Sequence, residues 1–227
     1  MLGSATIPVL RPARVSRILT HGVVVLIAFA GLPSAGKSTT AKALADQLSV
    51  RAFIEPEEEM WPAAVKDRDR VGQFTALSWF RSIRVPNLYS AAEAARVDGA
   101  AVIDSYYDVL LSQYIGSEPF AWLLDKKNRY FDIARRMAEI DWSDLPKADV
   151  LVMLQLNQDV WKAFMDRRAR DFDRDAGLKE QFAMQTLIAS ACRQAEVEHG
   201  TRLLVIEQED SSPARTAERI ASKLNTP

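Results

Sequence analysis

The sequence has 227 residues, of which 48% are hydrophobic and 26% are charged, as in an ordinary globular protein. This length suits one well-buried domain and is barely enough for two. The formal net charge of −1 gives no attraction to nucleic acid or to an anionic membrane, so we expect neither as a partner.

Residues 1–20 differ in composition from the rest of the chain. No acidic residue precedes Asp46, and three arginines interrupt a segment rich in Pro, Ala and Ser. Transit peptides share this composition with loose tails. We expect a flexible basic extension over 1–20 and a single domain over 21–227. We place the protein in the cytoplasm, with a transit peptide as the alternative.

The stretch VVVLIAFAGLPSAGKSTTAKAL begins at Val23 and contains the pattern G-x-x-x-x-G-K-S/T. An apolar, β-branched run leads in and predicts a strand, and an amphipathic segment leads out and predicts a helix. The glycines let backbone N–H groups converge on an anion, and the helix adds the positive end of its dipole. We predict a phosphate-binding loop for ATP formed by Gly31, Ser34, Ala35, Gly36, Lys37, Ser38 and Thr39.

Two loop residues and one distant acid would serve the phosphates and a magnesium ion. Lys37 would reach the β- and γ-phosphates, and the Ser38 hydroxyl would ligate Mg²⁺. The apolar run 100–103 predicts a strand that ends at Asp104. We predict that Asp104 completes the metal site beside Ser38; the alternative is that it caps the following helix.

A second acid, Glu55, ends the predicted strand 50–54, where Pro56 stops the pairing. A carboxylate there would accept the proton of a substrate hydroxyl as it attacks the γ-phosphate. The alternative is that Glu55 belongs to a solvated acidic run over 55–59.

The segment 72–96 predicts a helix that breaks near Pro86. Gln73, Trp61 and Trp79 are candidates to bind a planar substrate, by bidentate hydrogen bonds and by stacking. For both tryptophans a place in the core is an equal alternative.

The rest of the chain continues the alternation of helix and strand. Helices are predicted over 105–115, 120–140, 157–168, 178–199 and 213–224, and strands over 149–154 and 202–206. Five short apolar strands separated by helices predict an α/β fold with an open, mostly parallel sheet and helices on both faces. The site is expected at the carboxyl ends of the strands.

Arg167, Arg168 and Arg170 follow the predicted helix 157–168 and open a charged segment, 167–177. We predict a mobile lid there whose guanidinium groups, from Arg168 and Arg170 above all, stabilise charge on a transferring phosphoryl group. The alternative is a solvated basic turn.

With these motifs, the chain resembles the P-loop kinases of nucleosides and nucleotides, particularly deoxyribonucleoside and thymidylate kinases. Phe53-Ile54-Glu55-Pro56 with Trp61 is similar to the family's Glu-Pro…Trp signature, in which the glutamate is the catalytic base. Gln73 falls where the family has a base-reading glutamine. Residues 103–107 are similar to its Glu-Arg-Ser segment, and Arg168 and Arg170 match its lid arginines.

The resemblance implies the three-layer P-loop NTPase fold, with a five-stranded parallel sheet in the order 2-3-1-4-5. It also implies ATP and Mg²⁺ as cofactors, with Lys37, Glu55, Arg168 and Arg170 as catalytic residues. One departure concerns substrate binding, because Ser105 stands where the family has an orienting arginine. Arg81 or Arg84 from the preceding helix would replace it, and we add Arg81 to the predicted substrate-binding set.

The expected function is therefore ATP- and Mg²⁺-dependent phosphoryl transfer to a small-molecule hydroxyl, with a nucleoside as the leading acceptor. A nucleoside monophosphate is an alternative acceptor, with Lys66, Arg68 and Arg70 available for its phosphate. An antibiotic or metabolite alcohol is another. A non-catalytic NTP-binding switch module is the alternative from a different class. A homodimer through 72–96 and 120–140 stays open.

Overall fold

The computed structural model describes residues 24–168, 178–209 and 212–225. Its five strands form one sheet in the order β2-β3-β1-β4-β5, and every neighbouring pair is parallel. The strands are β1 Val25–Gly31, β2 Arg51–Phe53, β3 Ala100–Ile103, β4 Val150–Gln155 and β5 Arg202–Glu207. This confirms the predicted α/β fold and the strand order 2-3-1-4-5.

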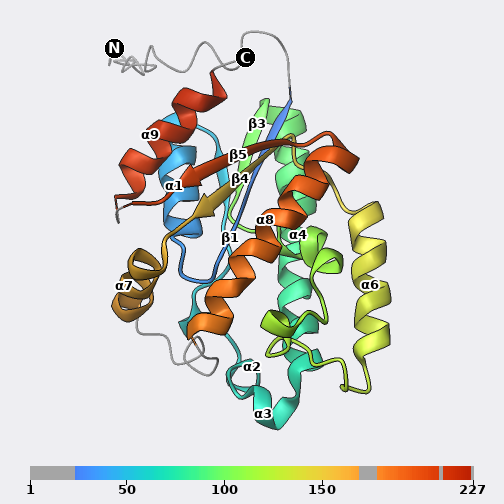
Figure 1. Cartoon of the computed structure of the whole chain (residues 1–227). Coiled ribbons are helices and arrows are strands. Elements are labelled where there is room, and N and C mark those ends of the chain that lie inside the picture. Colours follow the sequence, from blue (N-terminus) through green and yellow to red (C-terminus); the bar gives the residue numbers. More distant parts are fainter. Residues whose placement is uncertain (1–23, 169–177, 210–211, 226–227) are drawn as a thin grey trace, which may run out of the picture.

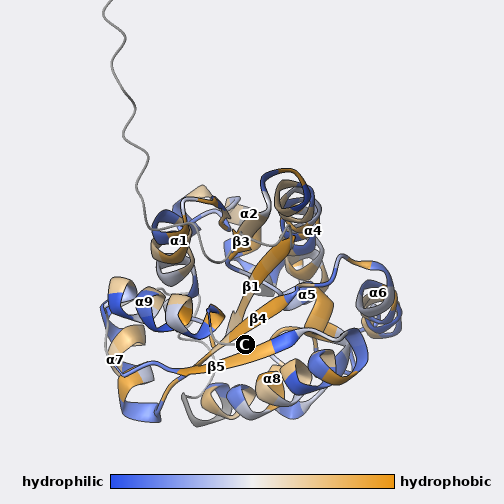
Figure 2. Ribbon diagram, turned by 90° about the horizontal axis from the view of Figure 1, so that it is seen from above, coloured by the Kyte–Doolittle hydropathy of each residue, from blue (hydrophilic) through white to orange (hydrophobic). Residues whose placement is uncertain are grey.

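Helices cover both faces of the sheet (Figures 1 and 2). The longer helices are α1 Lys37–Leu48, α4 Gln73–Asp98, α6 Phe131–Asp144, α7 Gln158–Arg168, α8 Leu178–His199 and α9 Pro213–Leu224. Helices α1 and α9 pack together on one face, while α4 and α8 contact the sheet from the other. The remaining described elements are short. They are the helices α2 Ala63–Lys66, α3 Arg68–Val71 and α5 Tyr107–Leu110, and the 3₁₀ turns η1 Glu58–Met60, η2 Leu111–Gln113 and η3 Glu118–Phe120.

The core forms around the central strands because their apolar runs are covered on both faces. Residues 26–30 of β1, 100–103 of β3 and 150–154 of β4 are buried throughout, and the strands are the most hydrophobic part of Figure 2. Cys192 of α8 lies in the same core as a free, buried thiol. Among the described residues, none of the helices combines the length and the apolar character that crossing a membrane requires.

Two helix predictions are wrong. Helix α4 runs without a break through Pro86, because buried residues on both sides of it, among them Leu77 and Leu88, anchor one helix face to the core. That packing outweighs the roughly 3 kcal/mol that a helical proline costs. The predicted helix 120–140 begins only at Phe131. The Ala121 carbonyl and the Asp125 N–H, which a helix would join to each other, both bond to the side chain of Gln73 in α4 instead.

Two segments with a sequence-based prediction lie outside the described residues. These are the extension 1–20 and the part of the lid over 169–177.

The predicted helix 105–115 is shorter than expected and consists of α5 followed directly by η2.

Candidate functional site

The turn between β1 and α1 lies at the carboxyl edge of the sheet, as the phosphate-loop pattern predicts. Gly31 has a φ of +144°, and a Cβ there would lie 2.8 Å from the Leu154 carbonyl oxygen, so no side chain fits. Gly36 precedes α1 with a φ of +80°, which favours glycine. Both glycines of the motif are therefore required by the backbone.

Lys37 is the first residue of α1, and its ammonium is held against the loop. Its Nζ donates to the carbonyl oxygens of Gly31 at 3.2 Å and Leu32 at 2.8 Å. Lys37 also lines the cavity described below, so the loop places a positive charge at one end of that cavity.

Ser38 and Asp104 meet at the junction of α1 and β3. The Ser38 hydroxyl donates to Asp104 Oδ2 at 2.6 Å, and the backbone N–H of Glu55 donates to the same carboxylate at 3.1 and 3.2 Å. Asp104 is 2% exposed, and burial, with the nearby Glu55 charge, raises its pKa to about 6. A buried carboxylate beside a hydroxyl is a set of hard oxygen donors, which fits Mg²⁺.

Glu55 lies just beyond β2 and forms an ion pair with Arg84 of α4. The Arg84 Nε lies 2.5 Å from Glu55 Oε1, and Nη2 lies 3.5 Å from Oε2. Burial opposes the charged form of Glu55, but the Arg84 charge and hydrogen bonds outweigh it, and a Ser105 hydrogen bond assists, so the pKa is below its usual range. Glu55 is therefore ionised at neutral pH.

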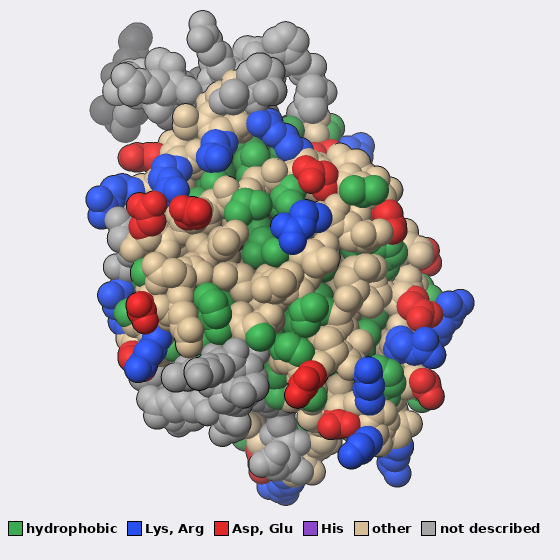
Figure 3. All heavy atoms as spheres, viewed as in Figure 1, with side chains coloured by type: hydrophobic (Ala, Val, Ile, Leu, Met, Phe, Trp, Pro, Cys, Tyr) green, Lys and Arg blue, Asp and Glu red, His purple; other side chains and the backbone are tan. Residues whose placement is uncertain are grey.

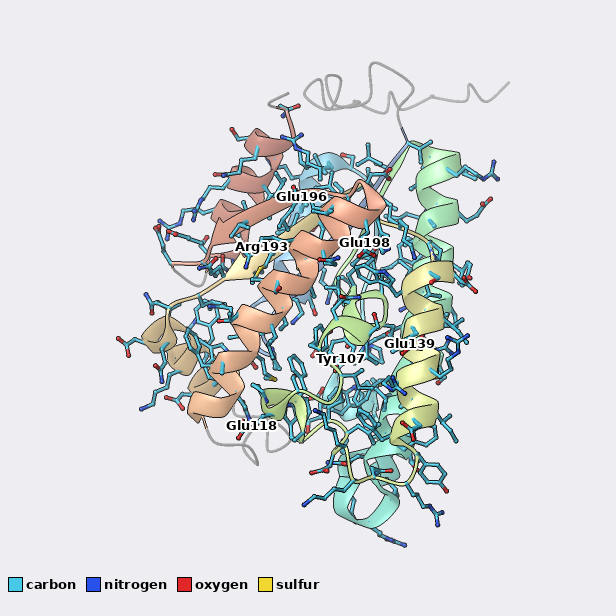
Figure 4. The ribbon with its side chains drawn as sticks, turned by 45° about the vertical axis from the view of Figure 1, so that its right-hand side comes forward. Tyr107, Glu118, Glu139, Arg193, Glu196 and Glu198 are labelled. Atoms are coloured by element: carbon cyan, nitrogen blue, oxygen red, sulfur yellow. The ribbon has the colours of Figure 1, made fainter. Side chains whose placement is uncertain are left out.

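Aromatic rings hold Arg84 in place. Its guanidinium carbon lies 4.9 Å from the Phe80 ring centroid and 4.7 Å from that of Tyr107, so cation–π contacts from α4 and α5 flank it. Figure 4 shows Tyr107, which is half-buried, between α8 and α6. Of the two arginines expected to replace the family's orienting arginine, Arg84 is therefore the one that lies beside Glu55.

Arg81 and Trp79, both from the predicted substrate-binding set, contact other side chains of the protein. Arg81 Nε and Nη2 each lie 2.7 Å from an oxygen of buried Asp141, so this pair joins α4 to α6. Trp79 packs edge-on against Trp61 and Phe80. Neither Arg81 nor Trp79 lines the cavity, and their part in substrate binding stays a prediction.

A cavity of about 160 Å³ connects the phosphate loop to a pocket of aromatic side chains. Lys37, Ser38, Asp104, Glu55 and Arg84 line its polar end. The other end is lined by predicted residues Trp61 and Gln73, and by Tyr114, Phe120, Trp122 and Met184, which the sequence reasoning missed. A usable signal was the density of aromatic residues in 106–122.

Other predicted residues lie away from this cavity or outside the described part. Arg168 ends α7, but its side chain and all of Arg170 lie outside the described residues, so the lid stays a prediction. Lys66 and Arg70 are exposed and do not line the cavity. On the face in Figure 3, basic and acidic side chains are interspersed rather than gathered by sign. The described residues contain no cluster of three or more His, Cys, Asp or Glu suited to a metal.

No known protein-family model matches this sequence, and no curated protein matches it. Solved structures do resemble it. A deoxyadenosine kinase from M. mycoides with bound dATP gives a TM-score of 0.64 at 16% identity, covering 88% of this chain and 100% of that one. The same kinase with dCMP and a flexible dCDP gives 0.63 at 15% identity, covering 88% and 98%. Thymidylate kinase from Ehrlichia chaffeensis gives 0.51 at 12% identity, covering 90% and 100%. The chain therefore has the fold of the P-loop nucleoside and nucleotide kinases.

Proposed function

We propose that this protein is a kinase that transfers the γ-phosphoryl group of ATP to a hydroxyl of a nucleoside. One observation carries the proposal: a phosphate loop and an arginine-paired carboxylate face the same cavity. The loop would bind the donor, and Glu55 lies where a hydroxyl acceptor would enter. The kinase fold of the similar structures supports the same assignment.

The donor side would use the loop amides and Lys37 to bind the phosphates. Ser38 and Asp104 would hold Mg²⁺, which when bound neutralises charge on the phosphate oxygens. Asp104 is suited to this role because burial makes its own negative charge unfavourable, so a nearby cation stabilises it.

On the acceptor side, Glu55 would accept the proton of the attacking hydroxyl. Its lowered pKa keeps the carboxylate ionised, at the cost of making it a weaker base. A weak base suffices because the loose transition state of phosphoryl transfer requires little early proton transfer. Arg84 would hold the carboxylate by two contacts and add positive charge close to the reacting groups.

A nucleoside is favoured over a nucleoside monophosphate. The aromatic end of the cavity suits a planar group. A second phosphate would need another cation. Lys66 and Arg70 do not line the cavity, and Arg84, which does, is already paired with Glu55. The ionised carboxylate of Glu55 also favours an enzyme over a non-catalytic switch module, because a protein that only binds a nucleotide does not require a general base.

The test is a phosphorylation screen with ATP and Mg²⁺ over nucleosides, nucleoside monophosphates and small alcohols, with products separated by chromatography. Lys37→Ala is the matched control, because it removes the phosphate-binding charge without altering the acceptor end. We expect acceptor-dependent ADP formation with nucleosides in the wild type and none in the variant. ADP formation that no acceptor stimulates would refute the proposal.

A further inference from the structure

The Gln73 side chain, at the start of α4, is bonded on all sides to one backbone segment. Its Nε2 donates to the carbonyl oxygens of Ala121 at 3.0 Å and Trp122 at 3.1 Å, and its Oε1 accepts from the backbone N–H of Asp125 at 3.1 Å. The reverse orientation would place the amide oxygen against two carbonyls, so the partners fix the assignment. Both amide hydrogens are therefore used.

We call these three hydrogen bonds the Gln73 latch. They tie α4 to the segment 121–130, which links η3 to α6. Trp122 and Leu123, near the start of that segment, line the cavity, as does Phe120 at the end of η3. The latch therefore shapes the aromatic end of the cavity by holding its wall in place.

Three further polar side-chain groups at this end also have protein partners. Trp61 Nε1 donates to the Pro56 carbonyl oxygen at 2.9 Å, and Trp122 Nε1 donates to Met184 Sδ at 3.2 Å. The Tyr114 hydroxyl donates to the Tyr107 carbonyl oxygen at 3.3 Å. An indole or a phenol has a single hydrogen to donate. These side chains consequently present their rings to a ligand, while their donors are already bound.

We infer that Gln73 is a positioning residue for the cavity wall rather than a reader of the nucleobase, and that this end of the cavity selects its ligand by shape and ring contact. The inference rests on the proposed function and names its acceptor class: a hydroxyl-bearing sugar joined to any flat ring of suitable size.

This assignment predicts an unusual selectivity. A site that hydrogen-bonds a polar substrate edge rejects an analogue without that edge by about 10⁴- to 10⁵-fold. A site that reads shape has no such penalty. We therefore expect thymidine, deoxycytidine and the 2′-deoxynucleoside that carries a phenyl ring in place of the base to have kcat/KM values within about tenfold of one another.

The wild-type comparison tests the inference without any variant. A preference of a hundredfold or more for the two natural nucleosides over the phenyl analogue would overturn it. Binding of the same three ligands, followed by the tryptophan fluorescence of the protein, compares their affinities without turnover. Absence of binding for all three also overturns the inference.

Gln73→Met separates the two roles of the side chain. The latch predicts that this variant lowers kcat/KM for all three acceptors by the same factor and speeds hydrogen exchange at the Asp125 amide. A base reader predicts losses for the natural nucleosides alone, with Asp125 exchange unchanged, and that result would refute the latch. Gln113→Met is the control, since Gln113 is exposed on η2 and does not line the cavity.

Failure of the proposed kinase function gives a different experimental result from failure of the Gln73 assignment. If ATP and Mg²⁺ phosphorylate none of the three acceptors, the kinase assignment fails. The fluorescence ratio and the exchange at Asp125 require no phosphoryl transfer, so they still confirm or refute the role of Gln73.

Discussion

Replacing Glu55 by glutamine tests the acceptor-side chemistry most directly. The substitution keeps the shape of the side chain and one hydrogen-bond acceptor, but removes the negative charge and the proton acceptor. General-base catalysis contributes about 10²- to 10⁴-fold, and the loose transition state of phosphoryl transfer favours the lower end. We expect kcat to fall about a hundredfold, which corresponds to about 2.7 kcal/mol of transition-state stabilisation.

The same substitution has a separate effect on stability, because Arg84 loses its partner. Breaking a fully buried ion pair costs about 3–5 kcal/mol. Here the side chains of Arg84 and Glu55 are 16% and 24% exposed, so water screens the remaining charge in part. Asp108 also contributes a favourable charge near Arg84. We expect a loss of about 3 kcal/mol or less in unfolding free energy.

Steady-state kinetics with saturating acceptor, nucleotide binding by calorimetry and thermal melting separate these effects. Glu59→Gln is the matched control, because Glu59 is an exposed member of the same acidic run. A folded Glu55→Gln variant should bind ATP normally and turn over slowly, while Glu59→Gln should resemble the wild type. Equal, small effects of both substitutions would refute the base assignment.

Three further predictions concern the donor, the lid and a buried acid. Lys37→Ala should abolish phosphoryl transfer with an unchanged melting temperature, and near-normal turnover would contradict the loop assignment. Arg168→Ala and Arg170→Ala should each lower kcat more than ATP affinity, because a lid acts on charge that develops in the transition state; equal losses would indicate ground-state binding. Asp108 is 4% exposed, its carboxylate has no hydrogen-bond partner among the described residues, and burial raises its pKa from 3.8 to about 6. Ionisation of Asp108 should therefore lower the free energy of unfolding by on the order of 3 kcal/mol at pH 8 and by almost nothing below pH 4. We expect Asp108→Asn to raise the melting temperature more at pH 8 than below pH 4. Equal increases at the two pH values would refute this.

The phosphate loop could be predicted from the sequence because its determinants are local. Gly31 and Gly36 stand where the backbone requires glycine, and an apolar run and an amphipathic segment flank them. The same local patterns identify all five strands. Since the strands are parallel, their carboxyl ends share one edge, which is why Glu55 and Asp104 could be expected near the loop.

Only the tertiary structure decided which arginine faces Glu55. Arg81 and Arg84 lie on the same helix, about 60° apart around its axis. The rotation of α4 about its axis, as it packs against β2 and β3, brings Arg84 into contact with Glu55 and Arg81 into contact with Asp141. No local pattern fixes a helix rotation that closely, because it results from the packing of the whole helix against the sheet and α6.

The role of Gln73 and the course of α4 through Pro86 have the same kind of cause. Gln73 takes its partners about 50 residues away in the chain, in a segment whose sequence by itself predicts a helix. Pro86 stays helical because core packing outweighs its local preference. The sequence by itself determined the five strands, the phosphate loop and the edge where the site lies. The tertiary structure decided the extent of the helices and the partner of each side chain, since those partners are distant in sequence and are selected by packing.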